Sequence, residues 1–286
     1  MAQRYFNPYT DFGFKKLFGE EANKELLVDF LNQLLPPHHQ IAQLQFKNAE
    51  SLPDTFAERK AIFDIYCESA DGHKFIVEMQ KAKLNYFKDR TLFYLTFPIR
   101  EQAEKGAWDF RLLPIYLIAI LDFEYDEHET RKFFRDVCLK DQDGEVFYEK
   151  LQLKFIQIPL FNKAEAELEN RFDKWLYFLK HLGSLEAIPT ILNEPIFQKG
   201  FEVAELALLS AEQHEQYKKS LLQYREIKAV TDTAFAEGKA EGLEEGLEKG
   251  KAEGKREIAK EMKAQQIPIP LIAKLTGFTE EEIIAL

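Results

Sequence analysis

Two short alternating segments on either side of one turn constrain the fold of this chain most strongly. Residues 61–67 and 74–79 each alternate between apolar and polar side chains, and Asp71-Gly72 lies between them. Strict alternation predicts β-strands, and a glycine in a three-residue loop predicts a tight hairpin. The chain therefore contains an antiparallel hairpin whose register can be read from its sequence.

That register gives the hairpin one apolar face and one polar face. The expected apolar face consists of Phe63, Ile65, Cys67, Phe75, Val77 and Met79. On the opposite face Asp64 lies across from Glu78, and Ile62 lies across from Gln80. Two facing carboxylates repel each other at neutral pH, and a divalent cation between them would remove the repulsion. The pair is a candidate metal site, with solvated surface charges as the common alternative.

The chemistry of such a pair is that of a hard divalent cation. Mg²⁺ takes few protein carboxylates, keeps several waters and binds substrate phosphate in its remaining positions. A bound cation lowers the pKa of water and offsets charge on phosphate oxygens. We therefore expect Mg²⁺ (or Mn²⁺ or Ca²⁺) as cofactor and phosphodiester hydrolysis as reaction.

The order of the predicted elements indicates an α/β fold. Apolar residues at helical spacing predict helices, and alternation or short apolar runs predict strands. The expected order is a helix at 23–35, strands at 41–46, 61–67 and 74–79, a helix at 86–104 and strands at 112–123, 133–139 and 146–158. Strand-helix-strand passages favour a mixed sheet flanked by helices.

We expect four regions along the chain. Residues 1–160 form the core with its sheet extension, 161–230 a helical support region, 231–263 a charged segment with glycine at every fourth position from Gly238 to Gly254, and 264–286 a small helix-turn-helix-like tip. The glycine segment is either a self-associating helix, which predicts a homo-oligomer, or a flexible acidic linker. The tip has one basic residue, Lys274, beside three glutamates, which favours protein contact over DNA contact.

Composition limits the partners and the setting of the protein. The formal net charge of -11 argues against loose binding to nucleic acid, although the acid excess lies downstream of residue 115. No apolar stretch reaches the length of a membrane span, and the first residues lack the pattern of a secretory signal. Two cysteines, Cys67 and Cys138, form neither a disulfide framework nor a zinc motif. A cytoplasmic protein without membrane contact is expected.

Four segments carry a resemblance to a known family. They are TDFGFKKLFG at 10–19, NKELLVDFLNQLL at 23–35, FDIYCESADGHKFIVEMQK at 63–81, and the glycine-periodic tail with its IAKLTGFTEEEI end. The chain resembles the PD-(D/E)XK nuclease superfamily, and more closely the Rpn family of recombination-promoting nucleases and transposases. The resemblance implies a restriction-endonuclease-like αβββαβ core with a helical C-terminal extension. It also implies a metal-dependent DNA endonuclease linked to recombination, mobile elements or defence.

The resemblance also assigns roles to individual residues. Asp64 and Glu78 match the metal-binding acids, and Gln80 stands where most superfamily members have a catalytic lysine. A further acid often completes such a site, and Glu25, Asp29 and Asp11 are the candidates. The candidate DNA contacts are Lys15, Lys16, Lys81, Lys83, Lys88 and Arg90.

Two alternatives to an active nuclease stay open at the level of sequence. A neutral Gln80 supplies no positive charge to a transition state, so the chain could be a catalytically inactive oligomer that binds DNA or a protein. A transposase proper would need a strongly basic reader module, which the sequence does not show. The choice between DNA and RNA, and between one and two metal ions, is also open.

Overall fold

A six-stranded mixed β-sheet forms the centre of the first of two structural units. The computed structural model describes residues 3–51, 61–103, 109–125 and 130–286. The chain divides into the units Met1–Lys228 and Ala229–Leu286. The sheet and all candidate site residues belong to the first unit, so the site is described within that unit alone.

The strand order confirms the predicted α/β architecture. Across the sheet the strands are β1 (Leu44–Phe46), β4 (Ile65–Ser69), β5 (Lys74–Gln80), β6 (Ile115–Leu121), β8 (Val146–Gln157) and β7 (Phe134–Lys140). The pairs β5-β6 and β6-β8 are parallel, and the pairs toward both edges are antiparallel. A separate pair joins β2 (Glu50–Ser51) to β3 (Ala61–Ile62). The central strand β5 is therefore paired on both sides.

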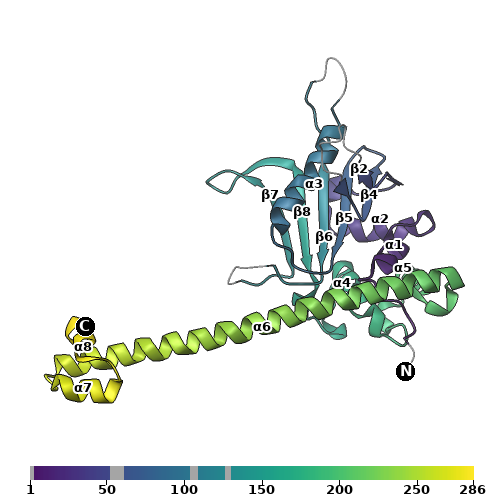
Figure 1. Ribbon diagram of the computed structural model, residues 1–286. Helices are drawn as coiled ribbons and strands as arrows, with labels where there is room; N and C mark the ends of the chain where they lie inside the picture. The colour runs from purple at the N-terminus through teal and green to yellow at the C-terminus, as the bar shows by residue number, and fades with distance from the viewer. Residues whose placement is uncertain (1–2, 52–60, 104–108, 126–129) are drawn as a thin grey trace. The chain divides into compact units, whose positions relative to one another are not determined.

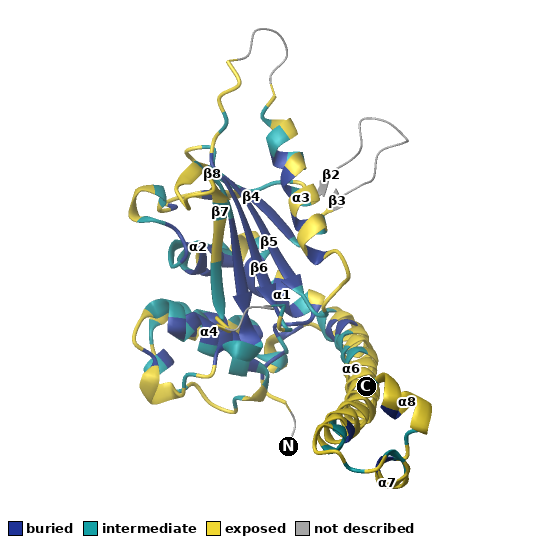
Figure 2. Cartoon of the chain, turned by 90° about the vertical axis from the view of Figure 1, so that its left-hand side faces the viewer, coloured by how far each residue is buried: buried dark blue, intermediate teal, exposed yellow. Residues whose placement is uncertain are grey.

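Helices cover both faces of this sheet (Figure 1). On one face pack α1 (Asp11–Phe18), α2 (Lys24–Asn32), α4 (Arg171–His181) and α5 (Pro195–Ala204), and on the other packs α3 (Phe87–Glu101). Figure 2 shows the central strands as buried along most of their length. The β6 run is buried at every position, because both of its faces meet apolar side chains.

Two helix predictions differ from the structure. The expected helix at 23–35 ends at Asn32 instead, and the buried Leu34 and Leu35 follow it in turns before Pro36. The helix α1 was not predicted. Thr10 caps α1, because its Oγ1 accepts a hydrogen bond of 2.9 Å from the Gly13 N–H. The expected last residue of the helix at 86–104, Glu104, lies outside the described residues.

The predicted hairpin register is correct, but the predicted single strand at 61–67 is interrupted. Ile65 pairs with Val77, and Cys67 pairs with Phe75, as expected. The chain bends at Asp64, so that β3 and β4 are separate strands. The bend turns Phe63 toward α3, where it packs against Tyr94 with a ring centroid distance of 5.2 Å. Its placement on the face of Ile65 was therefore wrong, and both faces of the hairpin are buried.

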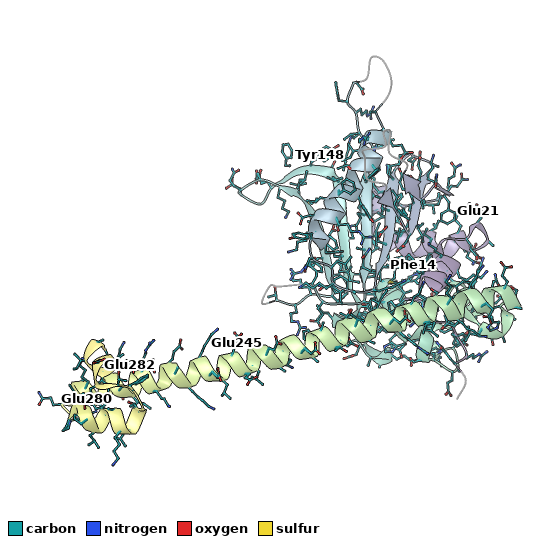
Figure 3. All side chains as sticks on the ribbon, in the orientation of Figure 1. Phe14, Glu21, Tyr148, Glu245, Glu280 and Glu282 are labelled. Atoms are coloured by element: carbon teal, nitrogen blue, oxygen red, sulfur yellow. The ribbon has the colours of Figure 1, made fainter. Side chains whose placement is uncertain are left out.

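The second unit is helical. The helix α6 (Ala211–Ala264) continues through the glycine-periodic segment, followed by α7 (Ile269–Thr276) and α8 (Glu280–Ala285). A Cβ added at Gly238 or Gly242 would meet nothing within 4 Å. Ala259, Ile272 and Ile283 form a small core between the helices. Thr279 and Glu282 form a capping box at the start of α8. Figure 3 shows Glu245, Glu280 and Glu282 along this unit.

A partly buried polar cluster joins α2 to α4. Asp29 accepts hydrogen bonds from Arg171 at 2.9 and 2.8 Å and from Trp175 Nε1 at 2.7 Å. The Trp175 side chain is fully buried, so Asp29 is the partner that satisfies its indole N–H. Asp29 thus ties the helix layer together.

We predict that Asp29→Ala lowers the free energy of unfolding by about 1–3 kcal/mol, because the buried Trp175 N–H and the Arg171 guanidinium lose their acceptor. Asp29→Asn, which keeps one acceptor oxygen, should lose less. Urea unfolding followed by Trp fluorescence measures both variants. Equal stability of Asp29→Ala and the wild type would contradict this role.

Candidate active site

The side chains of Asp64 and Glu78 both accept backbone hydrogen bonds where the β4-β5 ladder ends. Asp64 precedes β4, and its Oδ2 accepts a bond of 2.7 Å from the Met79 N–H. Glu78 lies on β5, and its Oε1 accepts a bond of 3.1 Å from the Asp64 N–H. Each carboxylate thus satisfies a backbone donor next to the other carboxylate. The bend at Asp64 therefore brings the two carboxyl groups together rather than parting them.

Burial raises the pKa of both carboxyl groups of this pair. Glu78 is 4% exposed, although the sequence placed it on a half-exposed face. Burial, and then the charge of Asp64, raise the pKa of Glu78 to about 8, against the opposing effects of the Asp64 N–H, Arg90 and Gln80. Burial also raises the pKa of Asp64, against a hydrogen bond from Met79. The folded protein therefore favours the protonated form of Glu78, and a bound cation would favour the ionised form instead.

The donor set fits one divalent cation with open positions. Asp64 and Glu78 offer hard carboxylate oxygens, which suit Mg²⁺ or Mn²⁺. Within the described part of the chain, no three His, Cys, Asp or Glu residues are grouped as a metal site. Two carboxylates with water and substrate in the other positions are a known mode for Mg²⁺.

Gln80 lies beside this pair at the end of β5. Its Nε2 donates a hydrogen bond of 2.9 Å to Glu78 Oε2. Arg90 of α3 approaches the same oxygen to 3.9 Å and is stacked on Tyr94. Gln80 therefore orients Glu78, while the positive charge near Glu78 comes from α3.

The helix α1 brings Asp11 and Lys15 to the other side of Asp64. The charge of Asp11 raises the pKa of Asp64, and the charges of Lys15 and Lys81 lower it. Lys15 and Asp11 form an ion pair of 3.1 Å. Of the three further acids suggested by sequence, Asp11 is the one that the fold brings to the pair.

The other two acids are engaged elsewhere. Asp29 lies against Arg171 and Trp175, and Glu25 forms an ion pair of 2.5 Å with Lys199 of α5. Neither residue lines the cavity beside Asp64. The face of α2 that carries them meets α4 and α5, which the sequence pattern of α2 alone does not show.

A cavity of about 470 Å³ opens beside Asp64. Its walls come from α1 and from the first turns of α6. The lining residues are Asp11, Phe12, Lys15, Lys16, Gly19, Glu20, Asp64, Gln216, Lys219, Ser220 and Gln223. The α6 residues were not among the predicted site residues, because they follow Asp64 by about 150 positions and carry no local motif.

The predicted basic contacts have different surroundings. Lys16 pairs with Glu20 at 2.9 Å, and Lys88 lies over the Tyr125 ring at 5.9 Å. Lys83 is exposed in the loop before α3. Lys83 and Lys88 line a separate cavity with Tyr125, while Lys15 and Lys16 line the cavity beside Asp64.

The geometry agrees with a comparison against known families. A family model described as PD-(D/E)XK nuclease family transposase matches residues 8–234. The chain belongs to this family. The match spans α1, the hairpin and the first turns of α6, so it covers every residue that lines the cavity. Membership of this family supports a nuclease-type function.

Searches of curated proteins and of solved structures give no match. Among the described residues, no helix is long and apolar enough to cross a lipid bilayer.

The raised pKa of Glu78 predicts a pH-dependent stability in the presence of a chelator. A carboxyl whose pKa rises from 4.5 to about 8 on folding holds its proton more tightly in the folded state. Stability should therefore fall as pH rises between these two values and level off above them. The stability of Glu78→Gln should not fall in this way, because the glutamine side chain stays neutral.

Thermal melting of both proteins at several pH values measures the difference. The melting temperature of Glu78→Gln should rise relative to that of the wild type as the pH increases from about 5 to about 8. Parallel curves for the two proteins would show that Glu78 ionises in the folded state as it does in the unfolded chain.

Proposed function

We propose that this protein is a Mg²⁺-dependent DNA endonuclease that hydrolyses a phosphodiester bond at Asp64 and Glu78. The observation that carries the proposal is the carboxylate pair of Asp64 and the buried Glu78, each held by a backbone N–H of the hairpin, with Asp64 lining a cavity that lysine side chains also line. Membership of a nuclease family supports the same reaction class. Mn²⁺ would support activity at the same ligands, and Ca²⁺ would bind there as well.

The residues of this chain have separate tasks in that reaction. Asp64 and Glu78 would hold the cation, which when bound supplies Lewis acidity toward water and phosphate. Gln80 holds the Glu78 carboxylate in place through its 2.9 Å hydrogen bond. The buried strand β5 keeps Glu78 fixed, because it pairs with β4 on one side and with β6 on the other. Catalysis gains from such preorganisation.

Lys15 replaces the charge that Gln80 lacks. Lys15 and Asp64 line the same cavity, and the charge of Lys15 lowers the pKa of Asp64, so a phosphate bound beside Asp64 would lie in the field of Lys15. Arg90 acts on Glu78 from the opposite side of the pair. Positive charge aimed at a reacting phosphate stabilises the negative charge that grows in the transition state.

The biological setting that fits this reaction is DNA cutting in recombination, mobile-element movement or defence.

We propose in addition that α6 mediates self-association. Its segment from Gly238 to Gly254 is helical, has open space at each glycine, and exposes Leu243 and Leu247. An exposed glycine helix allows close approach of a second backbone, which would offset the low helix propensity of glycine.

A catalytically inactive DNA-binding oligomer is the second candidate function. The observation that favours it is Gln80, whose neutral amide contacts Glu78 where a basic side chain would act on phosphate. Cleavage assays separate the two candidates, because an inactive protein would bind DNA without cutting it.

We predict that the wild type nicks or linearises supercoiled plasmid in Mg²⁺ or Mn²⁺ and that Asp64→Ala and Glu78→Gln reduce the rate at least about 100-fold. Glu25→Ala is the matched control, because Glu25 is an exposed acid paired with Lys199 and should keep its activity. Circular dichroism confirms folding of each variant. An inert wild type under every metal tried would favour the inactive binding protein.

We predict that Lys15→Ala lowers kcat about 10- to 100-fold with little change in KM, because its charge acts mainly on the transition state. Lys24→Ala is the control, since Lys24 pairs with Glu21 and does not line the cavity. Steady-state cleavage of a labelled duplex gives both constants. A rise in KM alone would make Lys15 a binding residue, and equal rates for Lys15→Ala and Lys24→Ala would remove it from the mechanism.

A further inference from the structure

The cavity beside Asp64 has one wall from outside the αβββαβ core. Gln216, Lys219 and Gln223 of α6 line it, and they follow one another at intervals of three and four residues, which places them on one helix face. Its volume of about 470 Å³ lies in the range of small-ligand sites. A nucleotide unit of a DNA strand is of that size class.

Hydrogen bonds hold this part of α6 against the core. The Tyr217 hydroxyl accepts a bond of 2.9 Å from the Asn7 N–H, and Ser220 Oγ accepts one of 3.1 Å from the Phe12 N–H. The Tyr224 hydroxyl donates a bond of 2.7 Å to Asp122 Oδ2. Ser220 and Phe12 both line the cavity, so the wall is fixed at the start of α1.

Four of the six charged side chains that line the cavity form ion pairs with each other. Lys15 lies 3.1 Å from Asp11, and Lys16 lies 2.9 Å from Glu20. Of the lining residues this leaves one carboxylate, Asp64, and one ammonium group, Lys219, outside any ion pair among the described residues. Asp64 belongs to the carboxylate pair. Lys219 is therefore the cation of this wall that is available to an anionic ligand.

The neighbouring Lys218 provides an internal comparison. It is also an exposed lysine, but it forms an ion pair of 2.8 Å with Glu215 and does not line the cavity. The side chains of Lys218 and Lys219 thus extend from different sides of α6, because successive helix positions do not share a face. General electrostatic attraction would involve both lysines, whereas a defined site would involve Lys219 alone.

We propose that this cavity is a subsite for a DNA backbone phosphate next to the bond that is cut, and that Lys219 contacts that phosphate. The inference rests on the proposed function in taking DNA as the ligand. The amide groups of Gln216 and Gln223 flank Lys219 on the same face and supply hydrogen-bond donors for phosphate oxygens. Lys219 is a positioning residue, which orients the strand while Asp64 and Glu78 carry the reaction.

The test compares Lys219→Ala, Lys218→Ala and Lys219→Arg in binding and in cleavage. Fluorescence anisotropy with a labelled DNA duplex in a chelator measures binding at several salt concentrations, and Mg²⁺ then starts cleavage of the same duplex. Lys219→Ala should weaken binding about three- to tenfold and lower the slope of log affinity against log salt by about one. Lys218→Ala should match the wild type, and Lys219→Arg should restore most of the binding.

The outcomes separate this inference from the proposed function. Cleavage by the wild type together with equal binding by Lys219→Ala and Lys218→Ala would overturn the subsite and leave the nuclease intact. Selective weakening by Lys219→Ala without cleavage by any protein would support the subsite and overturn the nuclease. A wild type that does not bind the duplex would overturn the subsite as well.

Discussion

Two carboxylates that accept backbone hydrogen bonds across the end of the hairpin hold the candidate site together. Asp64 accepts from the Met79 N–H, and Glu78 accepts from the Asp64 N–H, just where the β4-β5 ladder ends. These bonds replace ladder bonds that the bend at Asp64 removes, so the strand can end without leaving buried donors unpaired. The same geometry brings the buried Glu78 next to Asp64, where an added proton or an added cation offsets the repulsion between the two acids.

Much of this arrangement is predictable from the sequence, because a strand has a period of two and a glycine turn fixes the register. The pairing of Ile65 with Val77 and the proximity of Asp64 to Glu78 follow from that rule. Phe63 departs from it, because the chain bends at Asp64 and the ring of Phe63 packs under α3 instead. The alternation of side chains between the two faces holds where the strands are paired and fails beyond the last pair of the ladder.

Long-range packing explains what the sequence could not predict. Glu25 and Asp29 lie on a helix near the sheet, but Lys199, Arg171 and Trp175 engage them from helices far along the chain. Asp11 and Lys15 reach Asp64 because α1 packs beside the hairpin, and Lys219 reaches the same cavity because Tyr217 and Tyr224 anchor α6. A motif within a short segment reports none of these contacts.

Gln80 stands where most superfamily members have a lysine, so the residue that orients Glu78 is not a residue that supplies positive charge. Gln80 holds Glu78, and the positive charges lie on other elements, with Lys15 on α1 and Arg90 on α3. The acidic surface of the whole chain, with a net charge of -11, confines DNA attraction to such local groups.

Direct titration of the protein with Mn²⁺ tests the central claim, that Asp64 and Glu78 form a cation site. Isothermal calorimetry on the wild type, Asp64→Ala and Glu25→Ala measures binding without any assumption about substrate. We predict that the wild type and Glu25→Ala bind Mn²⁺ saturably and that Asp64→Ala does not. Equal Mn²⁺ binding by the wild type and Asp64→Ala, or no binding by the wild type, would contradict it.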